Sequence, residues 1–293
     1  MKKNWPVYLT YISVIFLIFA LYRADYLFIP DIHSYSDLGL SFVFLGAGFL
    51  LHTWSWKKLL LSYEFPVTLK NSIESFGLSV LGKYIPGKVW MLVGMSGHIQ
   101  RVYNYPLSSL LIASLSFQFI TLWTGLLVGS IGLFFIPTSR VYGWIVFLAF
   151  LALSFMLFNN KVYVYTNWLI EKFFKRKIDI PFIGFKKTFT PLILCLLMWV
   201  LYGLGFYYLT NGLLENSVGL VNMFSFALAS SAGVLALFAP GGLGVREGIL
   251  TFYLTSIGVS LDASVTISLM SRLWFFVGEL FTFMVAFFLN RKN

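Results

Sequence analysis

Long apolar runs separated by short polar or basic stretches dominate this sequence. A helix of about 20 apolar residues crosses the hydrocarbon core of a membrane, which is about 30 Å thick. Six runs approach or exceed that length, and they lie at 5–24, 38–56, 107–136, 141–158, 190–210 and 264–289. We therefore predict about six full membrane-spanning helices.

Two further apolar regions are interrupted near their middles. Residues 71–99 contain a Pro-Gly pair at 86–87, and residues 222–258 contain Pro-Gly-Gly at 240–242. Proline lacks a backbone N–H and glycine tolerates positive φ, so each motif predicts a break between two short helices. We expect two broken, re-entrant hairpins; the alternative is that each motif kinks one longer helix.

The composition is typical of a polytopic, all-α membrane protein. Of 293 residues, 59% are hydrophobic and 11% are charged, and the mean hydropathy is +0.83. So few charges do not solvate a globule of this size, which makes a soluble enzyme, a disordered chain or a secreted disulfide scaffold improbable. The single cysteine, Cys195, cannot form an intrachain disulfide or a cysteine-rich metal cluster. We expect no cofactor.

The basic residues predict an orientation. The formal net charge is +10 at pH 7, which in a soluble protein would suggest nucleic acid. Here the basic residues lie between apolar runs, where they indicate orientation and contact with anionic lipid headgroups rather than with nucleic acid. Only Arg23 and Arg140 fall on one side of the six-helix arrangement, and Arg246 and Arg272 lie inside apolar segments. We therefore expect a plasma-membrane protein with both termini in the cytoplasm.

An internal repeat relates the two halves of the chain. A shift of 154 residues places Pro86-Gly87 on Pro240-Gly241 and Gly94 on Gly248. The same shift carries the apolar run 38–56 onto 192–210 and the run 107–136 onto 261–290. We predict a single transmembrane domain, 1–293, with repeat 1 at 38–136, repeat 2 at 192–290 and a basic cytoplasmic linker at 159–189. The linker is either an amphipathic interfacial segment or an ordinary basic loop.

The charge pattern predicts that the two repeats have opposite topology. The first hairpin is flanked by Lys57-Lys58 and Arg101 and should enter from the cytoplasm. The second hairpin follows a helix that leaves the basic linker, so it should begin and end outside. Inverted repeats with broken helices are a common plan of transporters, whose substrate sites lie near the midplane where the broken helices meet.

The first break, GKYIPGKVW at 82–90, is called the first tip below. Unwound backbone at membrane depth is tolerated only inside protein or beside a wet cavity. Lys83 and Lys88 flank Pro86 and Gly87. Their ammonium groups either bind a phosphate or extend to the cytoplasmic headgroups.

The second break, PGGLGVREG at 240–248, is called the second tip. The sequence predicts a helix that starts near Val245, whose positive end would face an anion, with backbone amides brought close by the glycines. The guanidinium of Arg246 can bind a phosphate with two hydrogen bonds, and Glu247 would limit the net charge or exchange a proton. The alternative is a structural Arg246–Glu247 pair. The candidate residues of this tip are Pro240, Gly241, Gly242, Gly244, Arg246 and Glu247.

Further polar residues lie in or near the other apolar runs. Arg272 and Glu279 are seven residues apart, so they share a helix face that is expected to point toward the hairpins. Glu279 carries a proton or neutralises an arginine. His52, near Trp54, is expected at the membrane interface, and Glu74 is expected to be solvated in the inner loop region.

The two tips and the last helix carry a family resemblance. The chain resembles the membrane-embedded flippase domain of lysylphosphatidylglycerol synthases and related stand-alone proteins. The matching segments are GKYIPGKVW at 82–90, PGGLGVREG at 240–248 and Ser-Arg-Leu at 271–273. The resemblance implies movement of a lipid with a polar headgroup between leaflets, through a cavity lined by both hairpins. In the bifunctional synthases a large soluble domain follows the membrane part, whereas this sequence ends at Asn293, so we expect a lipid made by another enzyme.

Three functions are consistent with these patterns. The leading hypothesis is a non-enzymatic translocator, in which rocking of the two repeats moves a glycolipid, polyprenyl-linked sugar or aminoacyl phospholipid. No GxxxxGK[ST] motif for ATP is present. The alternatives are a non-transporting partner of envelope-synthesis enzymes and an intramembrane lipid transferase. A transferase would require paired carboxylates or a nucleophile beside a base, and no closely spaced aspartate pair occurs.

Overall fold

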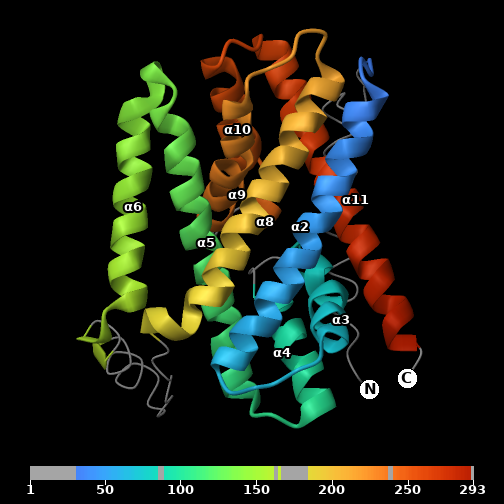
Figure 1. Ribbon diagram of the computed structural model, residues 1–293, viewed down its shortest axis with the longest axis vertical. Helices are drawn as coiled ribbons and strands as arrows, with labels where there is room; N and C mark the ends of the chain where they lie inside the picture. The colour runs from blue at the N-terminus through green and yellow to red at the C-terminus, as the bar shows by residue number, and fades with distance from the viewer. Residues whose placement is uncertain (1–30, 85–88, 162–163, 166–183, 237–239, 292–293) are drawn as a thin grey trace.

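The computed structural model describes residues 31–84, 89–161, 164–165, 184–236 and 240–291. Within these ranges the chain is all-α and contains no strand. Figure 1 shows long helices around a central pair, with shorter helices packed between them. The predicted fold class is therefore confirmed.

Five helical segments in the described part are long and apolar enough to cross a membrane. They are α2 (Tyr35–Ser62), α5 (Leu107–Phe134), the η2–α6 segment (η2 Pro137–Ser139, α6 Arg140–Phe158), α8 (Gly184–Leu213) and α11 (Leu261–Arg291). They correspond to five of the six predicted spans. The sixth, 5–24, lies outside the described residues, and so does much of the predicted linker 159–189.

Both interrupted apolar regions fold as pairs of short helices. The first contains α3 (Leu69–Ser79), the short 3₁₀ helix η1 (Val80–Tyr84) and α4 (Trp90–Tyr103). The second contains η3 (Leu220–Phe224), α9 (Ser225–Leu235), η4 (Pro240–Gly242) and α10 (Val245–Ser256). The α-helices therefore stop on either side of each predicted break, and neither region forms one continuous helix.

Helices α2 and α8 form the centre of the molecule (Figure 1) and pack closely along their length. A Cβ at Gly48 of α2 would lie 2.4 Å from the ring of Tyr202 of α8, so the contact leaves no room for a side chain. The Ser55 hydroxyl donates a hydrogen bond to the Pro191 carbonyl at 3.0 Å. Because Pro191 lies inside α8, this bond connects α2 to the turn of α8 that contains the proline.

The first arm of each hairpin packs against a long helix from the other half of the chain. Helix α3 lies on α11, where a Cβ at Gly77 would be 2.6 Å from the Cβ of Ala286. Helix α9 lies on α5, where a Cβ at Gly129 would be 2.9 Å from the Cα of Leu228. Glycine is required at both positions because the two backbones approach so closely.

The helix boundaries follow the 154-residue shift found in the sequence. Shifted by 154, the start of α5 at Leu107 falls on the start of α11 at Leu261, and Trp90 of α4 falls one residue before Val245 of α10. Figure 1 also shows that α2 and α8 run in opposite directions, and so do α5 and α11. The peripheral helix α6 packs mainly on α5 and leaves most of its apolar surface exposed, as expected for lipid contact.

Candidate functional site

The two tips meet inside the molecule. The 3₁₀ helices η1 and η4 contact each other, and a Cβ at Gly241 would lie 3.2 Å from the ring of Tyr84. Helix α11 contacts η1 as well as α10. Side chains from η1, α10 and α11 therefore converge where both hairpins are broken.

The backbone of the second tip requires its glycines. Gly241, Gly242 and Gly244 have φ of +59°, +71° and +79°, in the left-handed region that disfavours other residues. At Gly242 a Cβ would also lie 2.8 Å from the Cα of Gly233 in α9. The turn then leads directly into α10 at Val245, which is the helix start that the sequence predicts.

Glu247 is held by two donors. One carboxylate oxygen accepts the Gly244 N–H at 2.7 Å, and the other accepts from Nε of Arg272, also at 2.7 Å. Arg272 also donates to the Gly241 carbonyl at 3.5 Å. The carboxylate of Glu247 therefore links the second tip to α11, and the Gly244 N–H already has a hydrogen-bond acceptor within the protein.

Glu279 is held by the first tip. Its buried carboxylate forms an ion pair with the partly exposed Lys83 ammonium and accepts a hydrogen bond from the Tyr84 hydroxyl at 2.8 Å. The Lys83 ammonium also lies 4.8 Å from the centre of the Phe275 ring. Lys83 therefore points into the protein and contacts Glu279 and an aromatic ring.

Arg246 has no carboxylate partner among the described residues. Only 8% of the residue is exposed, and its guanidinium lies 4.6 Å from the Phe226 ring centre and 5.3 Å from that of Phe275. One terminal nitrogen donates to the Ser271 carbonyl at 3.3 Å and lies 3.5 Å from the Ser271 hydroxyl. Its Nε makes no hydrogen bond, and the Arg246–Glu247 alternative is not formed because Glu247 pairs with Arg272.

The charges in this cluster do not balance within the described residues. Each of the two carboxylates is paired with another cation, Lys83 or Arg272. Arg246 is left as a buried cation between aromatic rings. A buried charge without a counter-ion is costly, and intramembrane arginines are commonly functional. The arrangement is chemically suited to receive one anionic group at Arg246.

Two further donors without partners lie beside the same aromatic pair. The Tyr202 hydroxyl and the Trp274 indole N–H are buried and make no hydrogen bond. The ring centre of Tyr202 lies 5.4 Å from that of Phe275, and that of Trp274 lies 5.4 Å from that of Phe226. Buried tyrosine and tryptophan usually find a partner for the polar atom. Sequence reasoning missed both residues, because aromatic side chains in apolar runs resemble ordinary packing.

The family follows from comparison with known sequences. The model of the lysylphosphatidylglycerol synthase transmembrane region matches residues 8–280, which is nearly the whole chain. The chain belongs to this family. No match was found among curated proteins. The resemblance drawn from the two tips is therefore confirmed, and this member of the family is a multi-pass membrane protein of lipid and envelope biology.

The structure brings together most of the site residues that the sequence predicts for this family member. Those that converge are Lys83, Gly241, Gly242, Gly244, Arg246, Glu247, Arg272 and Glu279, with Pro240 at the start of η4. Pro86, Gly87 and Lys88 lie outside the described residues. His52 packs against the rings of Phe76 and Phe117, with ring centres 4.8 and 5.0 Å away.

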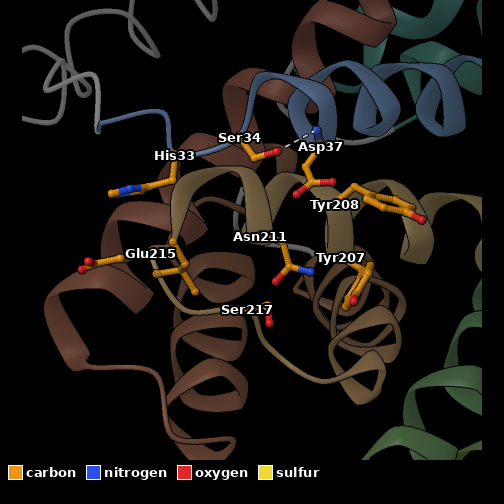
Figure 2. A pocket seen from close by; sticks show the side chains of 9 residues that line it. His33, Ser34, Asp37, Tyr207, Tyr208, Asn211, Glu215 and Ser217 are labelled. Carbon is orange, nitrogen blue, oxygen red and sulfur yellow. Dashed lines mark hydrogen bonds between the residues drawn. The ribbon is translucent and has the colours of Figure 1, made fainter.

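A polar cavity of about 350 Å³ lies elsewhere in this family member, between the start of α2 and the end of α8. Figure 2 shows His33, Asp37 and Glu215 among the side chains around it. It contains two carboxylates and no lysine or arginine. An anionic headgroup is therefore better matched by the cluster around Arg246. Among the described residues no group of three or more histidine, cysteine or acidic side chains is arranged to hold a metal ion.

Proposed function

We propose that this protein is a lipid translocator in which Arg246 binds the phosphate of a lipid headgroup. The observation that carries the proposal is the buried guanidinium of Arg246, which has no carboxylate partner among the described residues and an Nε without a hydrogen bond. A phosphate would supply both the missing charge and the missing acceptor, and a guanidinium can bind it with two parallel hydrogen bonds.

The position of Arg246 supports transport rather than simple binding. It lies where two broken hairpins meet, which is the usual place of substrate sites in transporters built from inverted repeats. A lipid phosphate held there is shielded from hydrocarbon, whereas a bare phosphate crossing a bilayer would have to lose its hydration. The acyl chains of the cargo would stay in the surrounding lipid. The cargo is a phosphate-bearing glycolipid, polyprenyl-linked sugar or aminoacyl phospholipid.

The proposed binding surface includes both tips and the face of α11. Its residues are Lys83, Pro86, Gly87, Lys88, Pro240, Gly241, Gly242, Gly244, Arg246, Glu247, Arg272 and Glu279. Within it, the pairs Lys83–Glu279 and Arg272–Glu247 connect the two tips to α11. These pairs would keep Arg246 as the cation that is available to the headgroup.

The same proposal includes an inverted repeat with cytoplasmic termini in the plasma membrane. The matching helix boundaries and the opposite directions of α5 and α11 support it. Single cysteines at Ser108 and Leu261, which are both exposed, test it in a Cys195→Ser background. We expect a membrane-impermeant thiol reagent added to intact cells to label the cysteine at 261 and not the one at 108. Labelling of both from the same side would contradict the inverted repeat.

Lipid movement itself can be measured in proteoliposomes. The probes are headgroup-labelled polyprenyl-phosphate sugar, aminoacyl phospholipid and a phosphate-free diacyl glycolipid, each followed by its accessibility to an impermeant quencher. We expect the protein to accelerate the movement of at least one phosphate-bearing probe, while the phosphate-free lipid stays at the rate of empty liposomes. If the protein accelerates all three probes equally, it is a nonspecific scramblase. If the folded protein moves none of the probes, a non-transporting partner of envelope enzymes is favoured.

A further inference from the structure

A second buried ionisable pair lies within the first hairpin, away from Arg246. Glu74 was expected to be solvated, but it is only 1% exposed in the middle of α3. The sequence-based expectation is therefore wrong, because α3 turns this carboxylate toward α4 rather than toward water. His98 of α4 is 7% exposed, and its Nε2 lies 3.3 Å from the Glu74 carboxylate.

The pair is connected to more exposed basic residues. Arg101, which is exposed, lies 3.4 Å from Nδ1 of His98, and the Lys70 ammonium lies 3.7 Å from the carboxylate of Glu74. The Glu74 oxygen that faces Lys70 accepts no hydrogen bond. Exposure therefore decreases from Arg101 through His98 to Glu74, and the two inner groups, His98 and Glu74, can each bind or release a proton.

Other charged groups on the helices around α3 are engaged elsewhere or form no ion pair with Glu74. On α2 the basic residues are His52, Lys57 and Lys58, and His52 packs on aromatic rings. On η1, Lys83 pairs with Glu279 of α11, and on α11 Arg291 lies over the Phe287 ring. Within the described residues, the ion-pair neighbours of the Glu74 carboxylate are thus Lys70 and His98.

The second hairpin shows that this pair is not needed to hold two arms together. Shifted by 154 residues, Glu74 corresponds to Leu228 and His98 to Phe252. Helices α9 and α10 pack against each other without an acid–histidine pair at these positions. A buried carboxylate is costly compared with a leucine, so its presence in one hairpin indicates a role other than packing.

We propose that Glu74 and His98 form a proton-binding site and that lipid movement is coupled to the proton bound there. This inference rests on the proposed translocator function. With one proton the pair is either carboxylate and imidazolium or carboxylic acid and neutral imidazole. A second proton, taken from water on the Arg101 side, leaves a carboxylic acid beside an imidazolium. The charge of a histidine responds to its surroundings, so a change in proton concentration on the accessible side can change the state of the pair.

The fold connects this pair directly to the lipid site. Helix α3 continues without interruption into η1, which carries Lys83 and Tyr84 onto Glu279. A change in the attraction between Glu74 and His98 alters how α3 sits on α4, and with it the position of the first tip. Proton binding and headgroup binding can thus be coupled through one helix.

The experiment combines a lipid assay with a direct proton readout. Proteoliposomes containing a phosphate-bearing probe lipid receive a gradient of about one pH unit, which for one coupled proton can drive up to about a tenfold difference in the probe between the two leaflets. In parallel, infrared difference spectra of purified protein from about pH 8 to about pH 5 follow the carbonyl band of a protonated carboxylic acid. Two variants change the pair: Glu74→Gln, and the double variant Glu74→Leu/His98→Phe, which has the residues found at the corresponding positions of the second hairpin. The control is Glu64→Gln, because the side chain of Glu64 is 84% exposed.

We expect the wild type and Glu64→Gln to respond to the gradient, and both Glu74 variants to lose the response while still moving lipid down its concentration gradient. The carbonyl band should be weaker in both Glu74 variants than in wild type and Glu64→Gln, by the contribution of one carboxylic acid, because the other carboxyl groups contribute equally to all four proteins. A band of wild-type intensity without Glu74 would overturn the proton site. If wild-type protein moves lipid but does not respond to the gradient, the coupling is overturned and the translocator function is kept. If the band depends on Glu74 but no lipid moves, the translocator function is overturned and only the proton site is supported.

Discussion

Arg246→Ala is expected to abolish lipid movement while leaving the protein folded. Each hydrogen bond between a guanidinium and a phosphate contributes about 1.5–3 kcal/mol, so the loss of two such bonds should slow translocation by at least about 10²-fold. The folded protein should tolerate the change, because Arg246 forms no ion pair among the described residues whose breakage would leave a buried carboxylate. The measurement is the rate of quencher accessibility in proteoliposomes, with folding followed by gel filtration and circular dichroism.

Two variants control this result. Arg246→Lys keeps the charge but loses the planar fork and the stacking on Phe226, so we expect a partial rate. Arg140→Ala removes an arginine that is exposed at the start of α6 and should leave the rate unchanged. A folded Arg246→Ala protein that moves lipid at the wild-type rate would exclude Arg246 as the phosphate-binding group.

Glu279→Ala is expected to cause the largest loss of stability. The carboxylate is fully buried and holds both Lys83 and Tyr84, so its removal leaves an ammonium without a counter-ion near the junction of the two tips. Breaking a buried ion pair in this way costs about 3 kcal/mol. For a chain of 293 residues that corresponds to a decrease of roughly 5 °C in the unfolding temperature, measured in detergent.

A double variant separates charge imbalance from packing. Lys83→Met/Glu279→Leu removes both charges and fills the space with apolar groups, so we expect it to recover most of the stability. Glu64→Ala, which removes an exposed acid, should leave the unfolding temperature unchanged. If the double variant is as unstable as Glu279→Ala, the loss comes from packing or from the Tyr84 hydrogen bond rather than from the unpaired ammonium.

The helices were predictable because their signals are local. Runs of apolar residues located α5, α6 and α11, and the glycines before Val245 predicted the start of α10. The observed helices extend beyond the apolar runs, as α2 shows by reaching from Tyr35 to Ser62. Polar residues at helix ends satisfy backbone groups outside the hydrocarbon, which hydropathy alone does not reveal.

The site was predictable as a set of residues but not as a set of contacts. The neighbouring residues Arg246 and Glu247 suggested a local pair, yet Glu247 binds Arg272 from a distant helix. Glu74 was misjudged because Lys70 and Asn71 beside it are typical of a solvated loop. Such pairings depend on which helix faces pack together, and the order of residues along one chain does not encode this directly.

The close contacts made by Gly77 and Gly129 constrain how the molecule can change shape. Each joins a hairpin of one repeat to a long helix of the other, α3 to α11 and α9 to α5. The two sequence repeats are therefore interlocked, and they cannot separate as two rigid bodies without opening these tight helix contacts. In the proposed translocator, the moving unit would therefore be a hairpin arm together with the long helix that it contacts from the other half of the chain, instead of one whole half rocking against the other.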